Sequence, residues 1–267
     1  MPVSLPARLL PWLLFPLFVL AAFVVEHSFA PLPQSLDHHA FADARNLANV
    51  PNFMDVFSNL AMIIPAIAGL GLTLSRGGVF FTLSERAFAL IFFAALAITA
   101  VGSTWYHLAP NDERLLFDRL PLALAFTAYI SWLIVERIRP HPGGIAMLLP
   151  WLAAGPACAL WWYAGPAGND LRFYLLLYGT ILTLAPWLML LRTPYDLKGR
   201  HWAAYFAFVL ALICDRLDHV IHALLGGHLS GHTLKHLLAG LAVFLLANML
   251  AQRSEPSATA ENLAQSR

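Results

Sequence analysis

Residues 87–108 read AFALIFFAALAITAVGSTWYHL, a run of 22 residues without Asp, Glu, Lys or Arg. A helix needs about 20 mostly apolar residues to cross the hydrocarbon core of a bilayer. This stretch is therefore long enough to span a membrane as a single helix. Its last turns carry polar side chains, among them Ser103 and His107, so the stretch is also a candidate for function.

Seven other stretches have the same apolar character and a similar length. They cover residues 8–25, 53–75, 117–138, 145–164, 171–191, 202–225 and 232–251. The apolar run of the first, about 18 residues, exceeds the length usual in a signal peptide, so we expect a retained helix. The sequence predicts an all-α fold, a polytopic bundle of transmembrane helices.

The composition excludes the main soluble classes of protein. Hydrophobic residues make up 59% of the chain and charged residues 12%, and the mean hydropathy is +0.66. Soluble domains contain about 25% charged residues, so a soluble fold, a disordered chain and a secreted disulfide scaffold are excluded. The net charge of +1 argues against a nucleic-acid partner. Cys158 and Cys214 lie in apolar runs, which predicts buried thiols.

Basic residues are unevenly divided between the two ends of the predicted spans. Ten Lys and Arg fall on the side that carries both termini, and four fall on the opposite side. Because cytoplasmic loops carry the excess of Lys and Arg, we expect the termini to be cytoplasmic. The predicted organisation is an N-terminal transmembrane helix within 1–30, a transmembrane domain over 31–252 and a disordered cytoplasmic tail over 253–267.

Polar residues within the predicted spans gather toward the side opposite the termini. Ionisable groups are costly inside a bilayer and usually mark functional sites. The polar residues that gather here come from four spans: Ser103, His107, Asp118, Arg119, Asp215, Arg216, Asp218, His219, His222, His232, Lys235 and His236. The convergence of four helices at one depth predicts a site there.

His232 and His236 have i, i+4 spacing, so they share one helix face and both imidazoles can reach one metal ion. His107 lies at the same predicted depth and is the candidate third ligand. Ser103 shares a helix face with His107, and Asp118 follows a short polar turn, so they are candidates for a hydrogen-bonding group and a general base. Structural roles stay open: interfacial histidines, a serine bonded back to its helix, and a helix cap at Asp118.

The spacing of these residues resembles that of the alkaline ceramidase family, in the CREST superfamily of membrane hydrolases. The residues that carry the resemblance are Ser103-x3-His107-x10-Asp118, Asp118-Arg-Leu-Pro121, His232-x3-His236 and Asp55-Val-Phe-Ser58-Asn59-Leu60. The resemblance covers about residues 43–251. The family has a seven-helix core, so the resemblance implies such a core with the helix at 8–25 added in front.

The resemblance also implies an activity. It implies a zinc ion held by His107, His232 and His236, with Asp118 and Ser103 lining the catalytic centre. The reaction implied is hydrolysis of the amide of ceramide, or of a related membrane lipid, into a fatty acid and a sphingoid base. The compact loops and short tail look bacterial, so we expect an inner-membrane protein whose active site faces the periplasm.

Two further expectations concern the surroundings of this site. Eukaryotic members of the family carry an acidic calcium-binding segment before the first core helix, and here Asp43 and Asn52 are candidate ligands for a second cation such as Ca²⁺. Asp218 is expected to orient a ligating imidazole through its other nitrogen. Whether His222 or His228 replaces one of the three ligands is open.

Three other functions compete with a ceramidase. One is a hydrolase of a different N-acyl lipid or of an ester lipid. Another is a receptor-like protein resembling the progestin-receptor and hemolysin-III branch, which has a similar arrangement of histidines. The third is a proton-coupled transporter, which the gathering of polar residues at one side disfavours because no polar path crosses the membrane.

Overall fold

The computed structural model describes residues 5–195, 197 and 199–254. This part of the chain is helical and forms no β-strand, which confirms the predicted all-α fold. Residues 255–267 of the predicted tail lie outside the described residues. The helices are α1 (Leu5–Ser28), η1 (Leu36–His39), α2 (Phe53–Ser58), α3 (Leu60–Ser75), η2 (Gly77–Val79), α4 (Leu83–Leu108), α5 (Asp112–Ile138), α6 (Pro142–Ala146), α7 (Leu148–Ala164), α8 (Arg172–Leu190), α9 (Gly199–Arg216), α10 (Asp218–Leu224) and α11 (Gly231–Gln252).

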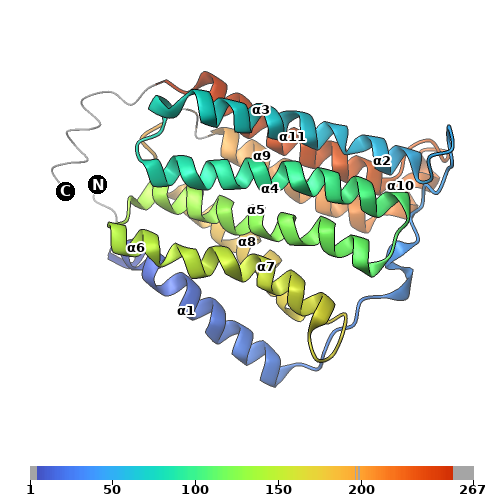
Figure 1. The fold of residues 1–267 in the computed structure, drawn as a ribbon, viewed down its shortest axis with the longest axis horizontal. Helices are drawn as coiled ribbons and strands as arrows, with labels where there is room; N and C mark the ends of the chain where they lie inside the picture. The colour runs from blue at the N-terminus through green and yellow to red at the C-terminus, as the bar shows by residue number, and fades with distance from the viewer. Residues whose placement is uncertain (1–4, 196, 198, 255–267) are drawn as a thin grey trace.

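The long helices lie side by side and run between the two ends of an elongated bundle (Figure 1). α4 and α5 form the central pair. α3, α9 and α11 pack on one side of this pair, and α7, α8 and α1 pack on the other. The start of α1 and the end of α11, called the chain ends below, lie at the same end of the bundle. The last turns of α4 and the first turns of α5 and α11 therefore meet at the opposite end.

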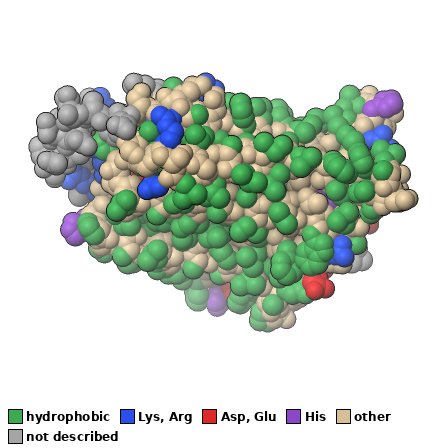
Figure 2. Space-filling model, turned by 45° about the horizontal axis from the view of Figure 1, so that its top comes forward, with side chains coloured by type: hydrophobic (Ala, Val, Ile, Leu, Met, Phe, Trp, Pro, Cys, Tyr) green, Lys and Arg blue, Asp and Glu red, His purple; other side chains and the backbone are tan. Residues whose placement is uncertain are grey.

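Within the described residues, seven segments are long and apolar enough to cross a membrane: Arg8–Ser28, Phe53–Ser75, Leu83–Leu108, Asp112–Ile138, Pro142–Ala164, Arg172–Leu190 and Gly231–Gln252. Large apolar side chains point outward along them, and Ile64 and Ile98, for example, are 63% and 60% exposed. Apolar side chains dominate the face seen in Figure 2, with Lys and Arg side chains toward its two ends. A surface of this kind is stable in lipid and not in water. The protein is a multi-pass integral membrane protein.

The span predicted over 202–225 differs from its expected form. These residues belong to two helices, because α9 ends at Arg216 and the short helix α10 starts at Asp218. His201 and Asp215 bound the apolar part of α9, which leaves it shorter than the about 20 residues of a typical span. α9 still runs along α11 through the bundle (Figure 1). The prediction of one continuous helix over 202–225 is therefore wrong.

A network of buried charges fastens the end of the bundle that bears the chain ends. Arg253 is 2% exposed and lies 2.8 Å from Glu85 of α4 and 2.8 Å from Glu136 of α5. Tyr195 donates a hydrogen bond to Glu85 at 2.8 Å, and Arg137 lies 3.0 Å from Glu136. The sequence prediction placed Arg253 in the tail, whereas the structure makes it part of the bundle. The network ties the end of α11 to α4 and α5.

Replacing Arg253 with methionine is expected to lower the unfolding temperature in detergent by about 10 °C. The change leaves Glu85 buried without its cation, which costs about 3–5 kcal/mol, whereas Glu136 keeps its ion pair with Arg137. Thermal unfolding followed by circular dichroism checks this. Arg200→Met is the control, since the half-buried Arg200 has no ion pair among the described residues and donates a side-chain hydrogen bond to Gln252 at 3.3 Å, and we expect a shift within about 2 °C. Equal shifts in the two variants would contradict a role for the network.

Candidate metal centre

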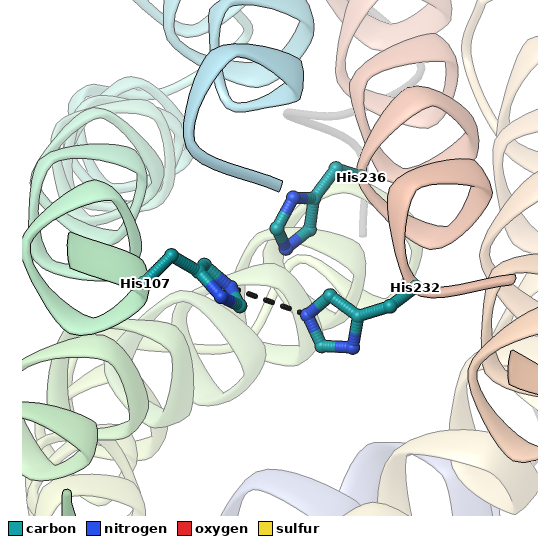
Figure 3. A group of neighbouring side chains, drawn as sticks. All are labelled: His107, His232 and His236. Carbon is teal, nitrogen blue, oxygen red and sulfur yellow. Dashed lines mark hydrogen bonds between the residues drawn. The ribbon is translucent and has the colours of Figure 1, made fainter. Parts of the chain in front are cut away.

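Three histidine side chains from two helices meet at the end of the bundle opposite the chain ends (Figure 3). His107 lies in the last turn of α4, and His232 and His236 lie in the first two turns of α11. The Nε2 atoms of His107 and His232 are 3.2 Å apart. One nitrogen of each ring lies within 4.8 Å of the others, and the three residues are 0–7% exposed. The structure thus brings together the three residues that the spacing selected.

Two carboxylates hold His232 in different ways. The ring Nδ1 of His232 lies 2.8 Å from Oδ1 of Asp215, whereas Asp218 accepts a hydrogen bond from the backbone N–H of His232 at 2.7 Å. The expectation that Asp218 orients an imidazole is therefore corrected, since Asp215 contacts the ring and Asp218 fixes the backbone. Lys235 lies 3.2 Å from the same oxygen of Asp215. Gly231 permits the close approach of α11 to α9, because a Cβ at this position would lie 2.1 Å from a backbone oxygen of α9.

His236 is held from the side of α2. Its ring Nδ1 lies 2.8 Å from the hydroxyl of Ser58 and 3.2 Å from the carbonyl oxygen of Asp55. When Nδ1 donates to an oxygen, Nε2 keeps its lone pair. In Figure 3 the other ring nitrogen of His236 points toward His107 and His232. The segment from Asp55 to Leu60, one of those that carry the resemblance, thus supports a candidate ligand.

The candidates Ser103 and Asp118 lie beside this cluster on neighbouring helices. Ser103 is one turn before His107 on α4 and is 2% exposed. Gly102 lets α5 approach, because a Cβ there would lie 2.2 Å from the carbonyl oxygen of Phe117 and 3.1 Å from the backbone nitrogen of Asp118. The close contact of α4 and α5 at Gly102 therefore brings Asp118 to the level of Ser103. Their chemical roles remain predictions.

Two of the structural alternatives do not hold for these residues. Asp118 is not a helix cap, because α5 begins six residues earlier and the Asn111 side chain accepts a hydrogen bond from a first-turn N–H at 2.9 Å. The second alternative was a Ser103 hydroxyl bonded back to its own helix. Thr99, one turn earlier on α4, makes such a bond, to the carbonyl oxygen four residues before it, at 2.8 Å. Among the described residues, Ser103 makes no such bond. Both side chains are thus available for chemistry.

The loop between α1 and α2 folds over the cluster. The centre of the Phe41 ring lies 4.6 Å from the His107 ring and 4.6 Å from the His232 ring. Next to it, the backbone N–H of Ala42 donates to the carboxylate of Asp218 at 2.9 Å. Sequence reasoning missed this contact, because Phe41 stands in a loop without a periodic pattern that would mark it. Phe41 covers two of the three rings on the outer side of the site.

The two residues selected as calcium ligands have protein partners. Asp43 lies 2.7 Å and 2.5 Å from the Nε and Nη2 atoms of Arg45. Burial acts to raise the pKa of Asp43, but the hydrogen bonds from Arg45 outweigh it and hold that pKa below its usual value. The amide of Asn52 donates to the carbonyl oxygen of His107 at 2.8 Å. Because Arg45 supplies the positive charge at Asp43, we propose no second cation here.

The geometry of the three histidines fits a single metal ion. Two nitrogens on a tetrahedral zinc are about 3.3 Å apart, given Zn–N bonds of about 2.0–2.1 Å, and Nε2 of His107 and Nε2 of His232 are 3.2 Å apart. In the part of the chain that the structure describes, this is the one group of three or more His, Cys, Asp or Glu side chains close enough to share an ion. His222 and His228, which the sequence left open as ligands, do not belong to it.

A comparison of the sequence with models of known protein families and with curated proteins found no match. The class of the protein therefore rests on its fold and its site. It is an integral membrane bundle of helices with a buried group of three histidines at one end, and the three are close enough together to hold a metal ion.

Proposed function

We propose that the protein is a zinc-dependent membrane hydrolase that cleaves the N-acyl bond of ceramide or of a related lipid. The observation that carries the proposal is the buried group of His107, His232 and His236, which lies beside Ser103 and Asp118. Neutral imidazoles suit zinc, and three of them leave one coordination position for water or substrate. The resemblance in spacing to alkaline ceramidases supports the choice of substrate.

Each side chain around the group has a place in amide hydrolysis. Zinc would polarise the amide carbonyl and make water a nucleophile near neutral pH. Asp118 would take the proton of the attacking water and deliver it to the leaving nitrogen. Ser103 would donate a hydrogen bond to the carbonyl oxygen as negative charge develops on it. Asp215 would hold the His232 ring in the tautomer with a proton on Nδ1 and a free Nε2.

An apolar cavity next to the cluster supports a lipid substrate. Residues of α3, α4, α5, α8, α9 and α11 line it. Ala239 of α11 lines it one turn after His236, and Leu96 of α4 lines it two turns before Ser103. The cavity thus lies between the same helices as the site, one turn further toward the middle of the bundle. An acyl chain would enter there while its amide stays at the histidines.

The proposal also includes an orientation. The excess of Lys and Arg in the loops on the side of the chain ends supports a cytoplasmic position for that side. The histidines lie at the other end of the bundle. In a bacterial inner membrane the site would then face the periplasm, among the headgroups of the outer leaflet.

Fatty-acid release from a long-chain ceramide by the purified protein tests the proposal. We expect release that stops when a chelator removes the metal and returns when zinc is added. Ester lipids and other N-acyl lipids of the same chain length form the second arm. Release that persists after complete removal of metal would contradict the metal-dependent mechanism, and inactivity on all of these lipids would contradict a hydrolase.

A further inference from the structure

Four arginines are buried in the described part of the protein: Arg119, Arg137, Arg172 and Arg253. Three of them have a carboxylate within 3.0 Å, namely Glu136 for Arg137, Asp170 for Arg172, and Glu85 and Glu136 for Arg253. Arg119 is 8% exposed and, among the described residues, has no carboxylate within ion-pair distance. Its Nη1 atom has no hydrogen-bond partner. In the described part of the chain, Arg119 is thus a buried cation without an ion-pair partner.

The contacts that Arg119 does make are all with neutral groups. Its guanidinium lies over the ring of Trp162 at 4.2 Å and near the ring of Tyr174 at 5.1 Å, and Nη2 donates to Nε2 of His38 at 3.2 Å. Burial and the neighbouring Arg119 lower the pKa of His38 to about 3, so His38 stays neutral at physiological pH. Ring contacts offset only part of the cost of burying a charge.

The place of Arg119 connects it with the candidate metal centre. It follows Asp118 directly on α5, and its partner His38 belongs to the loop whose Phe41 ring lies over His107. Lys235, the lysine next to the cluster, is already paired with Asp215 at 3.2 Å. Among the buried arginines, Arg119 is therefore the one whose charge is left for a ligand. A guanidinium presents parallel N–H groups that match the oxygens of a carboxylate or phosphate.

We propose that Arg119 binds the negatively charged headgroup, a carboxylate or a phosphate, of a lipid bound in this site. The inference rests on the proposed function and deepens it, because it names N-acyl lipids with an anionic headgroup as the substrate class. The rings of Trp162 and Tyr174 hold the guanidinium in place, and Nη1 is the donor still without an acceptor. A fatty acid, the product of hydrolysis, carries the same chemistry in its carboxylate.

Binding of lipids that cannot be hydrolysed tests the site without relying on catalysis. Native mass spectrometry of the whole protein in detergent compares palmitate and hexadecyl phosphate with hexadecanol. We expect the two anions to bind at least tenfold more tightly than the alcohol. Arg119→Met should remove this difference, and Arg119→Lys should keep part of it. Arg114→Met is the matched control, because Arg114 stacks on Trp105 at the same end of α5 and should leave the preference unchanged.

A kinetic experiment distinguishes an Arg119 that binds the headgroup of the substrate from an Arg119 that binds the fatty-acid product. N-palmitoylglycine and N-palmitoylethanolamine have the same acyl chain and headgroups of similar size, but only the first is anionic. We expect its KM to be at least tenfold lower in the wild type and equal to that of the second in Arg119→Met. Equal KM values in the wild type, with palmitate still bound tightly, would overturn the headgroup assignment in favour of the product.

The binding and kinetic experiments also distinguish a failure of the anion site from a failure of the proposed hydrolase function. If the wild type binds anions and alcohol equally, the anion site is refuted even when both amides are hydrolysed. If it prefers the anions but hydrolyses neither amide, the hydrolase proposal fails and the anion site stands. If Arg119→Met does not fold, the weaker preference expected of Arg119→Lys decides whether the anion is held by Arg119.

Discussion

His232→Ala is expected to reduce the bound metal from about one ion per chain to less than a tenth of that, and to abolish hydrolysis. The variant removes one of three ligands, and a site with two imidazoles binds zinc far more weakly. It also leaves Asp215 paired with Lys235 but without its contact with the imidazole ring. Metal content measured by mass spectrometry, together with fatty-acid release, checks both effects.

His228→Ala is the matched control for this prediction. His228 lies in the turn before α11, at the same end of the bundle, and does not belong to the three-histidine group. Its contact with Arg45 uses the backbone oxygen, at 2.8 Å, which alanine retains. We expect unchanged metal and activity. A His232→Ala protein with full metal content and normal turnover would show that the histidines are structural.

Asp118→Asn is expected to lower kcat by about 10²- to 10⁴-fold, the contribution usual for a general base, while the metal content stays the same. The amide keeps the size of the carboxylate but cannot accept the proton of the attacking water. Asp118 is not one of the three ligands in the group, so binding of the ion should not depend on it. Steady-state kinetics and metal analysis on the same sample separate the two effects.

Glu113→Gln is the control for Asp118→Asn. Glu113 is an exposed carboxylate in the first turn of the same helix, so its replacement should leave kcat within about twofold of the wild type. A kcat of Asp118→Asn that equals that of Glu113→Gln would remove Asp118 from the mechanism. Loss of metal in Asp118→Asn would instead make it a ligand or a support of the metal site.

The elements predicted well from the sequence are those governed by short-range rules. The apolar run at 87–108 and the polar residues at its end follow from the thickness of a bilayer and the cost of burying charge. The pair His232 and His236 follows from the helical period, because residues four apart share a face. These rules do not depend on which helices become neighbours.

The partners of the site residues depend on packing, and the sequence could not supply them. Asp215 and Asp218 are three residues apart, and on one continuous helix they would be equivalent candidates. The chain instead breaks at Leu217, where φ is −101° and ψ is 21°. The break leaves Asp215 against the ring of His232 and Asp218 against its backbone. A prediction of one helix over 202–225 cannot distinguish the two.

The placement of Arg253 in the tail was wrong for a related reason. Glu85, Glu136 and Arg253 lie close to predicted membrane boundaries, where long side chains usually reach the aqueous interface. In the structure they point inward, and Arg253 pairs with both carboxylates. Their pairing joins residues more than 100 positions apart in the chain, and no local pattern in the sequence marks it.

X-ray absorption at the zinc edge of the purified protein tests the central claim, that the three histidines hold one zinc ion, most directly. We expect one zinc per chain, with three imidazole nitrogens at about 2.0–2.1 Å and one oxygen ligand, and we expect this spectrum to disappear in His232→Ala. A protein that takes up no zinc, or whose zinc spectrum is identical in His232→Ala, would contradict the account.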